Sequence, residues 1–153
     1  FMDLPFWALN LRYPKKIGAI GTLFDNADNT VPVEMRVDYV FEGNEDRGEV
    51  HLVWWHGTPG PRGEDGNVRN LFGYRNGVLF TGSSGQILAD YGRHMLLPEA
   101  DFKDFKRPDP TIPDSLGHHK EFLEAIRSGK DDPRATTCHF DYSGALTEAV
   151  LLG

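Results

Sequence analysis

The sequence predicts an α+β domain: an open, mostly antiparallel β-sheet with helices packed on one face. Two observations predict the sheet. The alternating run Glu34–Phe41 is followed closely by the apolar run Glu49–Gly57, and a second hairpin spans Gly77–Asp90. Strands joined by such short loops pair antiparallel. A third observation predicts the helices, because Ser115–Gly129 and the segment from about Asp141 onward carry apolar residues at helical spacing. Hairpins followed by helices are typical of the α+β class.

Composition limits the classes of function. The chain has 153 residues, the size of one domain, and its hydrophobic content of 39% is sufficient for a core. The formal net charge is −7 and there is no basic run, which argues against nucleic acid as a partner. Cys138 is the single cysteine, so no internal disulfide and no C-x-x-C zinc pair is possible. No window approaches about 20 apolar residues, so no membrane-spanning helix is expected.

The first part of the chain is predicted to contain a short helix and two strands. Met2–Asn10 has the spacing of the last turns of a helix, and Tyr13-Pro14 then forces an extended or turn conformation. Lys16–Phe24 alternates loosely and is predicted to be a strand, followed by the turn-rich loop Asp25–Thr30. Glu34–Phe41 is the clearest strand, because its apolar and polar residues alternate strictly.

The strand Glu49–Gly57 is predicted to lie at the centre of the sheet. Its sequence, E-V-H-L-V-W-W-H-G, is largely apolar on both faces, as in a strand that is covered on both sides. The strand ends beside the loop Thr58–Asn67, and two tryptophans and a histidine at such an edge suit contact with a ligand. The alternative is that Trp54 and Trp55 are core residues and that His56 is only a turn residue.

The next part is predicted to be a hairpin, a short strand and a connector. Gly77–Gly82 and Gln86–Asp90 are expected to pair around Ser83-Ser84-Gly85, where glycine supplies the positive φ of a tight turn. Met95–Leu97 is expected to add a short strand. Pro98–Pro113 is an irregular, proline-rich connector.

Two helices are predicted to end the chain. Ser115–Gly129 has Ser115 as its expected N-cap and Gly129 as its C′ residue. The last helix is expected to begin near Asp141 or Ser143, with either residue as its cap. The first of the two helices carries one stripe that we expect to be buried, formed by Leu116, His119, Phe122, Leu123 and Ile126.

No complete catalytic motif is present in the chain. It lacks a G-x-G-x-x-G after a strand, a P-loop, H-E-x-x-H and G-x-S-x-G. His118 and His119 are candidate ligands or general bases, since imidazole titrates near neutral pH. Adjacent helical residues diverge by about 100°, so these two cannot hold one metal. His119 shares the apolar stripe and is expected to be a hydrogen-bonded core residue, which leaves His118 as the better candidate for a cleft. No metal site is predicted.

Several segments, taken together, resemble one enzyme family. The segments are Met2–Pro14 (M-D-L-P-F-W-A-L-N-L-R-Y-P), Trp54–Gly57, Gly77–Phe80 with Gly82 and Gly85, Gly117–His119 with Glu121 and Phe122, Phe140–Tyr142 and Leu146–Gly153. In combination they resemble the C-terminal domain of a bacterial-type subfamily of the Gfo/Idh/MocA oxidoreductases. The resemblance runs the whole length of the chain.

The resemblance implies a longer parent enzyme with an N-terminal Rossmann domain that binds NAD or NADP. The dinucleotide fingerprint, the E-K-P lysine and the D-x-x-x-H pair of the family would all lie before Phe1. Of the motif around the catalytic histidine only Asp3 remains, three positions after the place where the histidine is expected. We therefore expect residues 1–153 to be the substrate-side domain, with no bound cofactor and no activity alone. The ends of the chain agree with this expectation: Phe1 is not a start residue, and helical spacing continues to the end through Leu146, Ala149 and Val150.

Six residues are predicted to line the substrate pocket: Asp3, Arg12, Trp54, Trp55, His56 and His118. Aromatic faces stack on the C–H surfaces of sugars and imidazoles hydrogen-bond hydroxyls, so a sugar or polyol suits these residues. Trp54 and Trp55 point to opposite faces of their strand, so at least one of them is expected to be a core residue. The sheet face without helices is expected to expose apolar area and to join copies of the protein into a homo-oligomer.

Three functions remain open on the sequence. The first is the substrate-binding and oligomerisation domain of an NAD(P)-dependent oxidoreductase acting on a sugar or polyol. The second is part of an NAD-dependent glycoside hydrolase of the same family, which cleaves glycosides through transient oxidation. The third is a non-catalytic carbohydrate-binding or structural domain. Net formation of NADH distinguishes the first from the second, and an upstream G-x-G-x-x-G would exclude the third.

Overall fold

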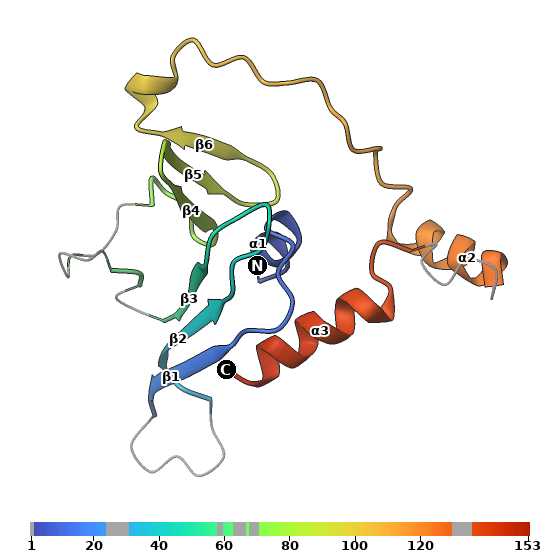
Figure 1. Ribbon diagram of the computed structural model, residues 1–153, viewed down its shortest axis with the longest axis horizontal. Coiled ribbons are helices and arrows are strands. Elements are labelled where there is room, and N and C mark those ends of the chain that lie inside the picture. The colour runs from blue at the N-terminus through green and yellow to red at the C-terminus, as the bar shows by residue number, and fades with distance from the viewer. Residues whose placement is uncertain (1, 24–30, 58–59, 63–66, 68–70, 130–135) are drawn as a thin grey trace.

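The computed structural model describes residues 2–23, 31–57, 60–62, 67, 71–129 and 136–153. The predicted loop Asp25–Thr30 and much of the loop Thr58–Asn67 lie outside the described residues. The elements, in chain order, are α1 (Asp3–Ala8), β1 (Lys16–Thr22), β2 (Glu34–Phe41), β3 (Val50–His56), β4 (Val78–Gly82), β5 (Gly85–Ala89), β6 (His94–Leu97), the 3-10 helix η1 (Glu99–Phe102), α2 (His118–Ser128) and α3 (Phe140–Leu151) (Figure 1).

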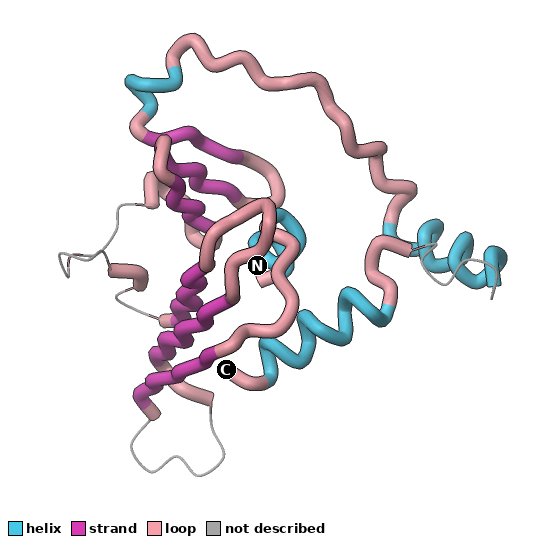
Figure 2. Tube along the Cα trace, in the orientation of Figure 1, coloured by secondary structure: helices cyan, strands magenta, loops and turns pink. Residues whose placement is uncertain are grey.

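The α+β class is confirmed, with strands and helices segregated along the chain (Figure 2). The strands form two antiparallel 3-stranded sheets, β1-β2-β3 and β4-β5-β6, in place of one continuous open sheet. Each sheet is a simple meander, because short connections pair neighbouring strands. The connection from β3 to β4 is much longer, and β4 begins a sheet of its own.

The predicted position of β3 is wrong for the described residues: β2 is the central strand and β3 lies at the edge of its sheet. The register places Val37 of β2 between Ala19 of β1 and Trp54 of β3. On the side of β3 away from the helices, Val53 is 38% exposed, so that side is not covered. An apolar run looks the same in sequence whether its second face is buried or open, which is why the prediction failed.

The core lies between one face of the β1-β2-β3 sheet and the helices α1 and α3. Phe6 of α1 is fully buried and meets Phe41 of β2 and Tyr142 of α3 edge to face, at ring-centre distances of 6.3 and 5.9 Å. The small residues Ala145 and Ala149 are buried beside them and let α3 approach the sheet closely. The prediction that helices cover one sheet face is therefore confirmed for α1 and α3 (Figure 1).

Helix α2 contributes no buried residue, contrary to the prediction. Phe122 and Ile126 of its apolar stripe are 65% and 60% exposed. His119 is exposed as well, so the predicted core role of this residue is wrong. Figure 1 shows α2 beyond the end of a long connector, away from both sheets. Helical spacing identifies residues that share a stripe, but it does not identify the surface that covers them.

The predicted N-caps are also wrong. Gly117, with φ 90°, occupies the N-cap position of α2, and Ser115 instead accepts a hydrogen bond from the Gly117 N–H at 3.1 Å. His139 is the N-cap residue of α3, so Asp141 and Ser143 lie inside the helix. The Ser143 hydroxyl donates back to the His139 carbonyl at 3.1 Å. Such local hydrogen bonds compete with capping, and sequence alone does not decide between them.

The second hairpin forms as predicted, and η1 packs against its turn. Gly82 pairs with Gly85 around Ser83-Ser84, and β6 adds a third strand. Gly85 has φ 153°, and a Cβ atom there would lie only 2.7 Å from the Phe102 ring and 3.0 Å from the Leu97 carbonyl oxygen. Glycine is therefore required at this turn for both conformation and space.

Candidate functional site

The structure places the predicted site residues in three separate regions. Asp3 and Arg12 lie together beside α3, at one end of the core. Strand β3 ends with Trp54, Trp55 and His56. The distant helix α2 begins at His118. The structure therefore brings together two of the six residues through a third side chain, Tyr142, and does not bring all six into one pocket.

Tyr142 connects the two predicted residues Asp3 and Arg12, and we call these three residues the Tyr142 cluster. The Tyr142 hydroxyl donates a hydrogen bond of 2.5 Å to Asp3 Oδ1. The Arg12 guanidinium carbon lies 5.8 Å from the centre of the Tyr142 ring, within the range of a cation–π contact. Asp3 is exposed, whereas Tyr142 is only 9% exposed. A surface carboxylate is thus held by a hydroxyl that belongs to the core.

The surroundings of Tyr142 keep its hydroxyl a proton donor. Burial raises the pKa of the Tyr142 phenol, and the hydrogen bond and negative charge of Asp3 raise it further. The hydroxyl therefore stays protonated throughout the ordinary pH range. His139 lies close by, with its ring centre 6.5 Å from that of Tyr142, and its buried Nδ1 has no hydrogen-bond partner among the described residues.

A polar pocket of about 310 Å³ adjoins the cluster on the Arg12 side. Part of its wall is structural: Arg47 donates from Nε to the Leu9 carbonyl at 2.8 Å and from Nη1 to the Glu42 carbonyl at 2.9 Å. The bond to Leu9 fastens the end of α1 to the β2–β3 turn, and the bond to Glu42 holds Arg47 within that turn. Arg12 Nη1 donates to the Leu11 carbonyl at 2.7 Å, which fixes the orientation of the guanidinium. The pocket is lined by Asn10, Arg12, Tyr13, Lys15, Phe41, Glu42, Asn44 and Arg47.

The two tryptophans of β3 lie on opposite faces of the strand, and both are only partly buried. The expectation that at least one is a core residue is met in part, because Trp54 packs against the core without being buried in it. Trp54 packs against the core beside Val37. Trp55 lies on the other face, where the Arg36 guanidinium stands 5.1 Å from its ring centre. His56 is exposed next to Gly57, whose φ of 87° and close approach to the Val33 carbonyl exclude a side chain. The end of β3 therefore offers Trp55 and His56 on different sides of the strand.

His118 is exposed at the first position of α2, with its ring centre 5.7 Å from that of His119. The neighbouring Glu121 accepts hydrogen bonds from the Thr136 and Thr137 hydroxyls at 2.9 and 2.6 Å, which tie α2 to the segment before α3. The Thr137 hydrogen bond is the main reason that the pKa of Glu121 is lowered. Nothing in the described structure brings His118 to the other predicted residues.

Sequence reasoning missed Tyr142 and His139. In the sequence, Tyr142 appears only as part of the segment Phe140–Tyr142 that resembles the enzyme family. Its helical spacing with Ala145 and Ala149 is the other signal, and it indicates only that Tyr142 is buried. The partner of its hydroxyl, Asp3, lies at the opposite end of the chain. No local pattern reports such a contact.

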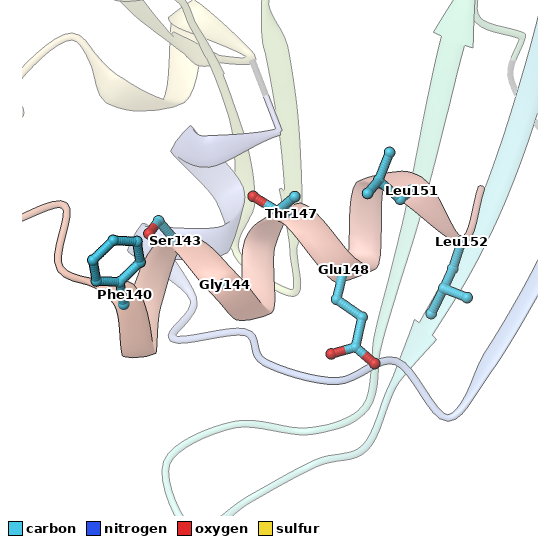
Figure 3. Close-up of a pocket in the computed structure, with 7 residues that line it drawn as sticks. All are labelled: Phe140, Ser143, Gly144, Thr147, Glu148, Leu151 and Leu152. Carbon is cyan, nitrogen blue, oxygen red and sulfur yellow. The ribbon is translucent and has the colours of Figure 1, made fainter.

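One face of α3 forms a shallow, open groove of about 500 Å³ (Figure 3). Tyr142 is not among the residues that line it. Phe140 and Leu151, at its two ends, are 93% and 80% exposed. Gly144 leaves the middle of the groove without a side chain. The groove is mostly apolar and is lined by Phe140, Ser143, Gly144, Thr147, Glu148, Leu151 and Leu152.

Within the described residues, no group of three or more histidine, cysteine or acidic side chains is placed to hold a metal. No helix in the described part of the chain is long and apolar enough to cross a membrane. A comparison with protein-family models gave no match, and neither did a comparison with curated proteins.

Proposed function

We propose that this chain is the substrate-side domain of an NAD(P)-dependent oxidoreductase that acts on a sugar or polyol. One observation carries the proposal: the exposed carboxylate of Asp3 is fixed by Tyr142 beside Arg12. Asp3 and Arg12 belong to the segment Met2–Pro14, which resembles the region that follows the catalytic histidine in Gfo/Idh/MocA enzymes. A fixed acceptor beside a guanidinium donor suits the recognition of sugar hydroxyls.

NAD or NADP would accept a hydride from the substrate, and we assign its binding to a Rossmann domain that precedes this chain. The residues present here do not fit a dinucleotide. The chain has no G-x-G-x-x-G, and its glycine-rich turn, Gly82–Gly85, joins two strands and so presents no helix N-terminus to a phosphate. The proposed role of this chain is therefore to bind and orient the substrate.

Two partners complete the proposal. The first is the upstream Rossmann domain. The second is another copy of the protein, joined through the open face of the sheet, which we define by Ile20, Arg36, Asp38, Val53 and Trp55. Ile20, Arg36 and Trp55 stand in one row across the three strands. Ile20 is 73% exposed, as an interface residue would be in a single chain.

The test is activity of the complete reading frame, produced with whatever precedes Phe1. We expect NAD⁺ or NADP⁺ reduction, followed by absorbance, with D-glucose or myo-inositol as the first probes. Release of nitrophenol from nitrophenyl glycosides without net NADH would instead establish the glycosidase. Residues 1–153 alone should bind no NAD⁺ in calorimetry, and stoichiometric tight binding would overturn the two-domain assignment.

The histidine assignments have their own test in the complete enzyme. His56→Ala and His118→Ala should each lower kcat/KM at least about tenfold, or roughly 1.4 kcal/mol. Both side chains are exposed, so the thermal midpoints should change little. His94→Ala, in the exposed part of β6, is the matched control and should keep normal kinetics. Normal kinetics in both site variants, or unfolding of both, would show that these histidines are structural.

A further inference from the structure

We propose that Tyr142 is a positioning residue for Asp3 in the proposed reaction. This inference rests on the proposed function and adds to it a residue on the last helix. The Tyr142 hydroxyl engages Asp3 Oδ1, and no hydrogen bond within the described residues engages Oδ2. Tyr142 therefore holds the carboxylate in one orientation and leaves Oδ2 for a substrate hydroxyl.

Asp3 needs such a partner because its own element holds it weakly. It is the first residue of α1, a helix of 6 residues, and it is exposed. An exposed aspartate in such a place ordinarily samples several rotamers, and fixing one of them before substrate binds removes an entropic cost from the reaction. A hydrogen bond of 2.5 Å from a hydroxyl to a carboxylate is the short, strong kind.

The Tyr142 ring is itself well fixed. It is 9% exposed and packs edge to face on Phe6, at 5.9 Å between ring centres and an interplanar angle of 72°. Phe6 is fully buried and belongs to the same helix as Asp3. The orientation of the carboxylate is thus set by the core and not by the solvent.

Arg12 is the second charged residue that contacts Tyr142. Its guanidinium carbon lies over the face of the Tyr142 ring, 5.8 Å from the ring centre. Tyr142 therefore contacts both a carboxylate acceptor, Asp3, and a guanidinium group, Arg12. One carboxylate and one guanidinium carry formal charges that sum to zero, which fits a neutral ligand with donor and acceptor groups better than it fits an anion. A vicinal diol of a sugar or polyol has this chemistry.

A purely structural role is the competing explanation, in which the bond only fastens α1 to α3. The two roles differ in what Tyr142→Phe changes. This variant keeps the ring and its packing on Phe6 and removes only the hydroxyl. A fastening role predicts a lower thermal midpoint with unchanged kinetics, whereas a positioning role predicts a lower kcat that depends on the presence of Asp3.

A double-mutant cycle in the complete enzyme separates these roles. It is measured with whichever of NAD⁺ or NADP⁺ is reduced and whichever of D-glucose or myo-inositol is oxidised. We expect Tyr142→Phe to lower kcat at least about tenfold in the natural background and less than about twofold in the Asp3→Ala background. Tyr39→Phe is the matched control, because it removes the hydroxyl of another buried tyrosine in the same core. It should lower kcat less than about twofold.

A second variant keeps the inference testable if Tyr142→Phe fails to fold. Asp3→Glu retains the charge at an exposed position but moves the carboxylate away from the hydroxyl, and it should lower kcat with little change in thermal midpoint. Equal effects of Tyr142→Phe in both backgrounds, or normal kinetics of Asp3→Glu, would overturn the positioning role while the proposed function stood. An unaltered complete enzyme that reduces neither NAD⁺ nor NADP⁺ would overturn the proposed function and, with it, this inference.

Discussion

Trp54 and Trp55 are neighbours in the chain, yet the sheet gives them different surroundings. Trp54 faces α1 and α3 and packs against the core, opposite Val37. Trp55 faces away from the helices and shares the open face with Arg36, whose guanidinium lies 5.1 Å from its ring centre. Alternation along a strand places one of these residues against the core and the other on the open face.

This difference predicts unequal effects on stability. Trp54→Ala should lower the unfolding free energy of residues 1–153 by about 2–4 kcal/mol, because it empties a site that is packed on one side. Trp55→Ala should cost about 1 kcal/mol or less, the size of an exposed cation–π contact. Urea denaturation followed by circular dichroism measures both values. Equal losses would contradict the assignment of the two faces.

Single residues were predictable from sequence only where their role is local. The division of Trp54 and Trp55 between two faces follows from strand geometry alone. The hydrogen bond from Tyr142 to Asp3 does not, because it joins the two ends of the chain and depends on how α3 packs. Arg12 was a predicted site residue, and its contact with the Tyr142 ring likewise needed the fold.

At the scale of elements, local periodicity predicted the strands well. Glu34–Phe41 matches β2 residue for residue, and the second hairpin formed as expected. Tertiary placement was not predictable in the same way: β3 lies at a sheet edge and α2 remains outside the core. Both errors have one cause. An apolar pattern predicts that a face of a strand or helix is buried, but it does not predict which part of the molecule covers that face.

The exposed apolar stripe of helix α2 leads to a testable prediction about the surface that covers it. Phe122 and Ile126 are 65% and 60% exposed in this chain, and we expect the Rossmann domain that we propose upstream to cover them in the complete protein. Phe122→Ser and Ile126→Ser should therefore leave the thermal midpoint of residues 1–153 nearly unchanged, because they remove no buried contact there. The same variants should lower the midpoint of the complete protein by several degrees, as losses of about 1–3 kcal/mol would do.

Lys120→Ser is the control for the α2 variants, since Lys120 is exposed on the same helix and lies beside the apolar stripe. It should leave both proteins unchanged. Calorimetry measures all four midpoints for each protein. A lower midpoint of the Phe122→Ser variant in residues 1–153 would show that the stripe already has a partner within this chain.

For the whole molecule, two opposing features govern association. The net charge of −7 makes copies repel one another. The open face works against that repulsion, because it combines exposed apolar residues with charges of both signs. Arg36 and Asp38 form an ion pair of 2.6 Å on it, flanked by Ile20 and Val53, which are 73% and 38% exposed. Among the strands that the structure describes, none pairs with the outer edge of β3, and this edge adds backbone groups that can pair with another chain.

We therefore predict that residues 1–153 self-associate more readily than their charge suggests, through the open face. Sedimentation velocity at rising concentration should show a dimer or larger species. Ile20→Glu should shift the equilibrium toward monomer, because it places a charge in the row formed with Arg36 and Trp55. Ile112→Glu is the matched control: Ile112 is 62% exposed but lies in the connector before α2, so the same substitution there should leave association unchanged. A clean monomer at high concentration, or equal behaviour of the two variants, would exclude the open face as the interface.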